Sequence, residues 1–136
     1  MYRSNVGRYK QNKVVLSTPE EILIALYDGA IKFSKQARVA IDSGDTATKG
    51  QKLGGVMAIL TELSATLEHS RAPELCENLA RLYDYMIDRL QTAGLRMDIE
   101  PLDEVIGHLE KLRATWVEAI EIAARERKGE QAVNVG

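Results

Sequence analysis

The chain has 136 residues and a formal net charge of −2, and hydrophobic residues make up 45% of it. This length suits one domain with a single core, and the near-neutral charge without a basic stripe gives no reason to expect nucleic-acid binding. The single cysteine, Cys76, excludes an internal disulfide and a cysteine-based zinc site, and the absence of a long apolar run or signal peptide favours a cytoplasmic protein with no membrane span.

Residues 1–16 are expected to form a flexible N-terminal arm. They contain arginine and lysine but no acidic residue, together with apolar side chains that include Tyr9 and Val14. Because such side chains are unfavourable in water, we expect the arm to fold back over an apolar groove of the same chain until a partner displaces it. A frayed terminal tail is the alternative.

The first helix is predicted from Pro19 to about Ser43. Thr18 and Glu21 have the spacing of a capping box, and proline suits the first turn of a helix. Apolar residues then recur at spacings of three or four along the segment, which indicates a helix with one face on a core. Gly44 is the expected left-handed stop.

Asp45 is predicted to cap a second helix, which ends before a break at residues 70–73. Gly50, Gly54 and Gly55 weaken the first half of this helix. We favour close approach of a neighbouring helix as the reason for these glycines, and a loosened turn is the alternative. The apolar residues of the segment are Leu53, Val56, Met57, Leu60, Leu63 and Leu67.

A third helix is predicted to follow Pro73 and to end at Gly94. Asp98 is predicted to cap a fourth helix, with Pro101 in its first turn. The sequence then becomes polar, and residues 129–136 are expected to form a disordered tail. The apolar residues are Leu75, Leu79, Leu82, Met86 and Leu90 in the third helix, and Leu102, Val105, Ile106, Leu109, Leu112, Trp116, Val117 and Ile120 in the fourth.

The order of these elements predicts an all-α fold. No segment alternates apolar and polar residues between turn signals, as a strand would. Four helices joined by short connections must run mostly antiparallel. We therefore expect an antiparallel up-down four-helix bundle over residues 17–128, with the flexible arm before it.

The two histidines give little support for metal or phosphate chemistry. A di-iron bundle needs Glu-x-x-His pairs, but the residues three positions before the histidines are Thr66 and Val105. His108 with Lys111 one turn later could mark a histidine phosphotransfer domain, although Leu112 stands where a small residue would leave the imidazole accessible. Phosphate-loop and nucleophile-elbow motifs are also missing. We therefore expect no cofactor, no metal and no enzymatic activity.

The apolar surface exceeds what a bundle helix needs. Tyr83, Tyr85 and Ile87 widen the apolar arc of the third helix to roughly 200°. Ile59 and Leu63 widen that of the second helix to roughly 160°. These residues either contact a second neighbouring helix or line a groove that receives the amphipathic segment of a partner. In the second interpretation, Tyr85 and Arg89 form an aromatic wall and a charged rim.

Four segments occur in the order in which one known family has its motifs. They are Tyr9-Lys10-Gln11-Asn12-Lys13-Val14, then Ser17 to Ile22 with Leu26-Tyr27-Asp28-Gly29-Ala30-Ile31, then Leu82-Tyr83-Asp84-Tyr85-Met86 with Arg89-Leu90, and Leu112-Arg113-Ala114-Thr115-Trp116 with Glu118-Ala119. Together they resemble the motifs of the flagellin-specific export chaperone family, FliS, from about Tyr9 to Ala124.

The resemblance implies a small helical bundle that binds newly made flagellin in the bacterial cytoplasm. Members of the family hold the disordered C-terminal segment of flagellin, prevent premature filament assembly and help delivery to the flagellar type III export gate. The gate and flagellar regulators are further candidate partners, and a generic helical adaptor is the alternative function. The residues expected to contact the partner are Tyr9, Asn12, Val14, Leu26, Tyr27, Ile59, Leu63, Leu82, Tyr85, Met86 and Arg89.

Overall fold

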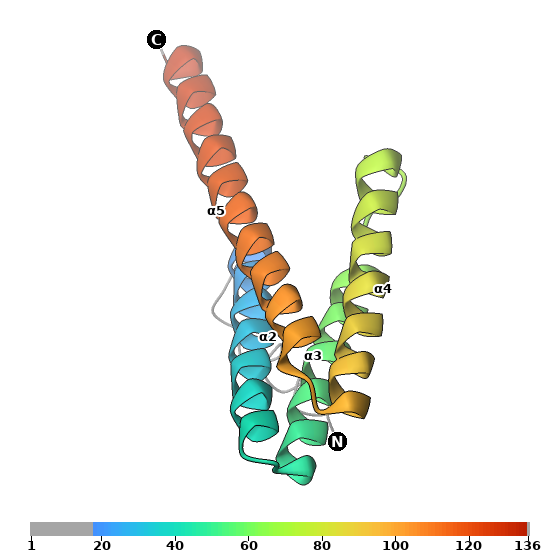
Figure 1. Cartoon of the computed structure of the whole chain (residues 1–136). Coiled ribbons are helices and arrows are strands. Elements are labelled where there is room, and N and C mark those ends of the chain that lie inside the picture. Colours follow the sequence, from blue (N-terminus) through green and yellow to red (C-terminus); the bar gives the residue numbers. More distant parts are fainter. Residues whose placement is uncertain (1–17, 136) are drawn as a thin grey trace.

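The structure, a computed structural model, describes residues 18–135 as four α-helices, and no strand occurs among these residues. The helices are α2 (Pro19–Asp42), α3 (Thr46–Ala65), α4 (Pro73–Arg96) and α5 (Ile99–Val135). Successive helices run antiparallel and are joined by short connections (Figure 1). This arrangement confirms the predicted all-α, up-down bundle.

The helices surround one core. α2 packs against α3 and α5, and α4 packs against the same two helices from the other side. The centre of the core contains large side chains that are fully buried, among them Tyr27, Leu60, Met86 and Leu109. α4 and α5 lie close together where they are connected and diverge toward the amino end of α4, so this side of the bundle opens as a V (Figure 1).

Local hydrogen bonds define the helix ends that the sequence predicted. The side chain of Thr18 accepts a hydrogen bond from the backbone N–H of Glu21 at 3.2 Å, which caps α2. Gly44 follows α2 with a φ of +72° and is the expected left-handed stop. Asp45 then caps α3 by accepting a hydrogen bond from the N–H of Thr48 at 3.1 Å.

The end of α4 differs from the prediction. The helix continues through Gly94 to Arg96, and Met97 takes the left-handed conformation with a φ of 50°. Gly94 instead lies where α3 approaches α4. A Cβ atom at this position would lie 3.1 Å from Leu53 Cδ1, and the Gly94 carbonyl accepts a hydrogen bond from Lys49 Nζ at 2.9 Å. The prediction was wrong because residue type alone does not distinguish a helix stop from a close approach.

The second correction concerns the end of the chain. Asp98 caps α5 as predicted, since its carboxylate accepts a hydrogen bond from the N–H of Glu100 at 3.0 Å. However, α5 continues to Val135, where the sequence predicted a disordered tail from residue 129. The last turns contain glutamate, glutamine and alanine, which favour helix, and contain no proline; Gly129 costs only about 1 kcal/mol relative to alanine. α5 therefore projects beyond the other helices (Figure 1).

Candidate partner-binding groove

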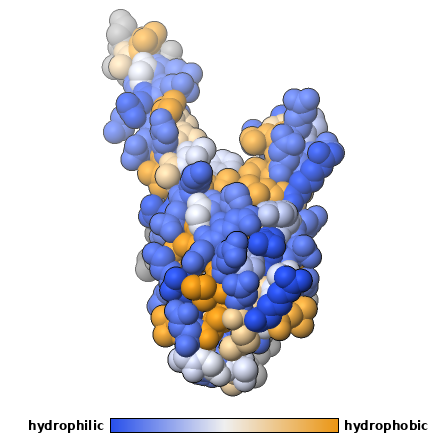
Figure 2. Space-filling view, viewed as in Figure 1, coloured by the Kyte–Doolittle hydropathy of each residue, from blue (hydrophilic) through white to orange (hydrophobic). Residues whose placement is uncertain are grey.

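An apolar groove lies in the V where α4 diverges from α5. It has a volume of about 570 Å³ and is bounded by the amino end of α2, the carboxyl end of α3, the amino half of α4 and the middle of α5. Figure 2 shows apolar side chains in the hollow between α4 and α5. Its main apolar lining residues are Ile22, Leu26, Leu63, Leu75, Leu79 and Trp116.

One edge of this groove exposes an apolar side chain and carries a charged pair. Leu75 in the first turn of α4 is 53% exposed, although leucine is usually buried. Arg71 and Glu68, which also line the groove, form an ion pair with each other at 3.4 Å between Arg71 Nη1 and Glu68 Oε2. The groove therefore offers mainly apolar surface, with opposite charges that balance at its edge.

Hydrogen bonds connect three aromatic side chains at the floor of the groove. The hydroxyl oxygens of Tyr27 and Tyr83 lie 2.6 Å apart, and the indole N–H of Trp116 donates to the Tyr27 hydroxyl at 3.1 Å. Burial raises the pKa of both tyrosines, and the hydrogen bond to Tyr27 raises the pKa of Tyr83 further. Both hydroxyls are therefore protonated at neutral pH. This network joins α2, α4 and α5 beneath the groove.

Several of the residues predicted to contact a partner lie at this groove or in the core beside it. Leu26 and Leu63 line the groove, and Tyr27 lies beneath it in the floor network. Leu82 is half-buried against the core. Ile59 and Met86 are also buried in the core but, unlike Leu26 and Leu63, they do not line the groove. The burial of Ile59 agrees with the first of the two interpretations of the wide apolar arcs, in which these residues contact a neighbouring helix.

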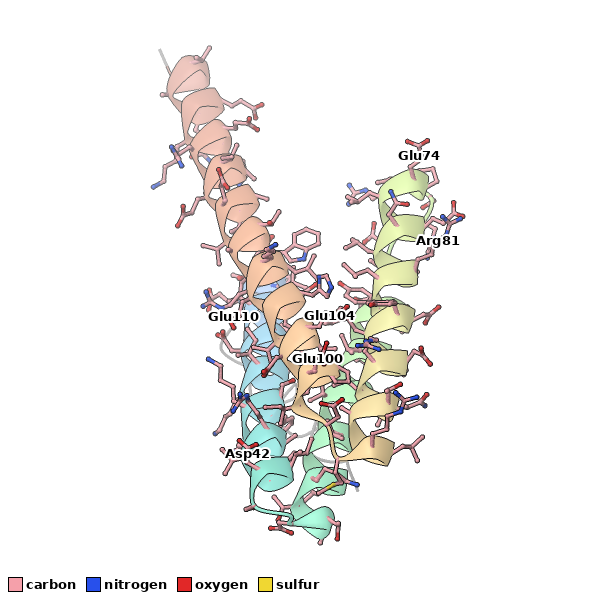
Figure 3. The ribbon with its side chains drawn as sticks, viewed as in Figure 1. Asp42, Glu74, Arg81, Glu100, Glu104 and Glu110 are labelled. Carbon is pink, nitrogen blue, oxygen red and sulfur yellow. The ribbon has the colours of Figure 1, made fainter. Side chains whose placement is uncertain are left out.

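Tyr85 and Arg89 lie apart from the groove lining, at the contact between α4 and α5. Tyr85 is half-exposed and meets the ring of His108 edge to face, with ring centres 6.3 Å apart. Arg89 Nε lies 3.3 Å from Glu104 Oε1. Figure 3 shows Glu104 on the side of α5 that faces α4. The predicted aromatic wall and charged rim are thus polar links between these two helices.

The carboxylate of Glu104 is the centre of this polar contact. Tyr85 hydrogen-bonds to it, Arg89 lies beside it, and His108 Nε2 is 3.5 Å from Glu104 Oε2. The hydrogen bond from Tyr85, followed by the positive charge of Arg89, lowers the pKa of Glu104, and the same hydrogen bond raises the pKa of Tyr85. The contact holds α4 to α5 on the side where the two helices meet.

The remaining predicted contact residues, Tyr9, Asn12 and Val14, lie outside the described residues. Conversely, the sequence did not identify Leu75, Leu79 or Trp116 as groove residues and assigned them to the core face of their helices. Periodicity shows which side of a helix is apolar, but it does not show where two helices diverge. Tyr83, which was predicted to widen the apolar arc of the third helix, is buried in the core and only 1% exposed.

Residues 18–135 contain no group of three or more histidine, cysteine, aspartate or glutamate side chains that could hold a metal ion. None of the four helices in this range is long and apolar enough to cross a membrane.

Comparison with known proteins identifies the family. The family described as flagellar protein FliS matches residues 2–123. The chain is 36% identical over 121 residues to the flagellar secretion chaperone FliS of Bacillus subtilis, and the aligned region covers 89% of this chain and 90% of that protein. It is 35% identical over 107 residues to the flagellar secretion chaperone FliS of Salmonella typhimurium, and the aligned region covers 78% of this chain and 79% of that protein. The chain therefore belongs to the FliS family of flagellar proteins.

Proposed function

We propose that this protein is a cytoplasmic flagellar secretion chaperone that binds the disordered C-terminal segment of flagellin in the groove between α4 and α5. The relatives from Bacillus subtilis and Salmonella typhimurium carry the name flagellar secretion chaperone. The observation that supports a binding role most directly is the open apolar groove itself, with a half-exposed leucine at its edge. An apolar groove on a stable bundle suits an amphipathic helix from a partner.

The physical basis of this function is folding coupled to binding. A disordered segment loses conformational entropy when it becomes ordered, and burial of its apolar face against the groove offsets that loss. While bound, the flagellin segment is unavailable for filament assembly. Such binding needs no nucleotide. Release at the flagellar type III export gate is the second part of the proposal.

Two exposed leucines on the same helix provide a matched test. Leu75 lies at the groove edge, whereas Leu95 is 87% exposed at the other end of α4, outside the groove lining. Leu75→Gln should weaken binding of a synthetic peptide with the C-terminal sequence of the same bacterium's flagellin by about tenfold, because an apolar contact is lost. Leu95→Gln should leave affinity unchanged. Isothermal titration calorimetry on the full-length chain measures both.

Trp116 gives an independent signal, because it is the only tryptophan of the chain and lines the groove. Binding of the peptide should change its fluorescence. If the wild-type chain gives no heat and no complex at tens of micromolar, the flagellin proposal is wrong and the generic adaptor remains. If the two leucine variants bind equally well, the partner occupies another surface.

A further inference from the structure

Tyr27 reaches the groove only through the side chains around it. It was predicted to contact the partner, but it is 0% exposed and does not line the groove. Its hydroxyl oxygen accepts a hydrogen bond from the indole N–H of Trp116 at 3.1 Å and shares a second hydrogen bond with Tyr83. Of these two neighbours, Trp116 is the one that is only partly buried, and it lines the groove. The indole therefore connects Tyr27 to the surface that a client would touch.

Open space lies beside the indole of Trp116 on its groove side. The groove has a volume of about 570 Å³ there, and a side chain with open space beside it can exchange between rotamers. A tryptophan N–H that enters a protein interior needs an acceptor, and the Tyr27 oxygen provides one. The hydrogen bond thus selects the orientation of the indole that turns its N–H toward α2.

This selection needs only the oxygen of Tyr27. Either tyrosine can be the donor in the hydrogen bond between Tyr27 and Tyr83, and in both cases the Tyr27 oxygen can accept from the indole. The backbone at this level is held separately, because Arg113 on α5 donates a hydrogen bond to the carboxylate of Asp28 on α2. Loss of the Tyr27 hydroxyl should therefore release the indole of Trp116 and leave the two helices in place.

We propose that Tyr27 is a positioning residue for client binding, because its hydroxyl oxygen holds the Trp116 indole in one orientation before the client arrives. The inference rests on the proposed function and gives Tyr27 a role that needs no contact with the client. A side chain that is already ordered loses less conformational entropy when a partner packs against it. Tryptophan also has the large, rigid surface that is typical of the residues on which binding energy depends most. The buried hydrogen bond should therefore increase affinity.

Tyr27→Phe and Tyr83→Phe are a matched pair of variants. Both remove the hydrogen bond between the two tyrosines, but only Tyr27→Phe also removes the acceptor of the indole N–H. Trp116 is the only tryptophan of the chain, so time-resolved fluorescence anisotropy of the full-length chain without peptide measures the motion of this indole alone. Tyr27→Phe should add a fast decay from rotamer exchange, and Tyr83→Phe should keep the wild-type decay. Urea denaturation of both variants measures the loss of folding stability that they share.

Isothermal titration calorimetry with the flagellin C-terminal peptide measures the effect on the client. Tyr27→Phe should bind about fivefold more weakly than the wild type, and Tyr83→Phe should stay within about twofold of it. In a chain that already carries Trp116→Phe, the change Tyr27→Phe should weaken binding no further, because the side chain that it positions is absent. A purely structural role of Tyr27 would weaken binding to the same extent in both backgrounds.

The outcomes separate this inference from the proposed function. If the anisotropy decay of Tyr27→Phe equals that of the wild type, the hydroxyl does not hold the indole and the inference is wrong. If the indole becomes mobile but Tyr27→Phe and Tyr83→Phe bind the peptide equally well, the function stands and the orientation of Trp116 does not matter for it, which also overturns the inference. If the wild-type chain does not bind the peptide, the proposed function fails and the role of Tyr27 in client binding fails with it.

Discussion

Gly55 on α3 lies directly against the ring of Phe33 on α2. A Cβ atom at Gly55 would lie only 2.8 Å from Cδ2 of this ring, closer than the 3.0 Å below which real Cβ contacts essentially never occur. Phe33 also has the ammonium group of Lys52 5.3 Å from its ring centre. Gly55 therefore allows α2 and α3 to pack closely, as predicted. The same explanation does not apply to Gly50, because a Cβ atom there would meet nothing within 4 Å.

Gly55→Ala should destabilise the protein. The added methyl group must displace the Phe33 ring or separate the two helices, and overpacking of this kind costs roughly 1–3 kcal/mol. Gly107 on α5 is the matched control, because a Cβ atom there meets nothing within 4 Å. Gly107→Ala should stabilise the chain by up to about 1 kcal/mol, since alanine favours helix. Urea denaturation measures both, and a stabilised Gly55→Ala variant would contradict the close contact.

Leu109→Ala should cost about 2–5 kcal/mol of folding free energy, because it leaves a cavity at a buried site. Leu109 is 0% exposed and lies in the core cluster. Leu95→Ala is the control, since Leu95 is 87% exposed and its truncation should change stability by less than about 0.5 kcal/mol. Thermal and urea unfolding give the two values. A loss near zero for Leu109→Ala would mean that α5 does not pack as described.

The polar contact between α4 and α5 should make stability depend on pH. Tyr85 and Arg89 from α4 and His108 from α5 surround Glu104, and the hydrogen bond from Tyr85 is the largest cause that lowers the pKa of its carboxyl group from the ordinary value of 4.5. A lowered pKa means that the ionised carboxylate stabilises the folded state above pH 4.5. This contribution is lost as the pH falls through the folded-state value.

Glu104→Gln should therefore make the folding stability depend less on pH in the acid range. Its stability relative to wild type should be lowest near neutral pH, and the difference should shrink below pH 4.5. Glu110→Gln is the control, because Glu110 is exposed and points away from α4 (Figure 3). Glu110→Gln should show the same dependence of folding stability on pH as the wild type. Urea denaturation at a series of pH values measures the profiles, and parallel profiles for all three chains would exclude a role for Glu104.

Helix boundaries could be predicted from the sequence where local hydrogen bonds determine them. Thr18, Asp45 and Asp98 each cap a helix with a neighbour two or three residues away, and Gly44 needs only its own backbone freedom. Gly94 was misread because its role depends on Leu53 and Lys49, which are distant in sequence. A single sequence does not show which distant residues meet.

The sequence predicted an apolar groove but did not identify most of the residues that line it. The wide apolar arc of the third helix correctly indicated more apolar surface than one neighbour needs. Which residues of α4 remained open depended on the divergence of α4 from α5, which leaves Leu75 exposed near the amino end of α4 while Met86, nearer the connection, is buried. Tyr83 was hardest to place, because a tyrosine can enter a core only if its hydroxyl finds a partner, and that partner, Tyr27, lies on another helix.

The arm gives the last prediction. Residues 1–16 precede α2, and Pro19, the first residue of α2, lines the apolar groove. The chain therefore enters the bundle at the edge of this groove. From the sequence we expect Tyr9 and Val14 to cover the groove, and covalent attachment gives even weak contacts a high effective concentration.

Deletion of residues 1–16 should then expose the groove. Binding of a dye such as ANS, which reports exposed apolar surface, should increase, and the truncated chain should self-associate in sedimentation experiments. Leu75→Gln in the truncated chain should reduce the additional dye signal, because it makes the groove edge polar. Deletion of residues 130–136 at the other terminus should change neither measurement. If the chain without its arm binds no more dye than the intact chain and stays equally monodisperse, the arm does not cover the groove.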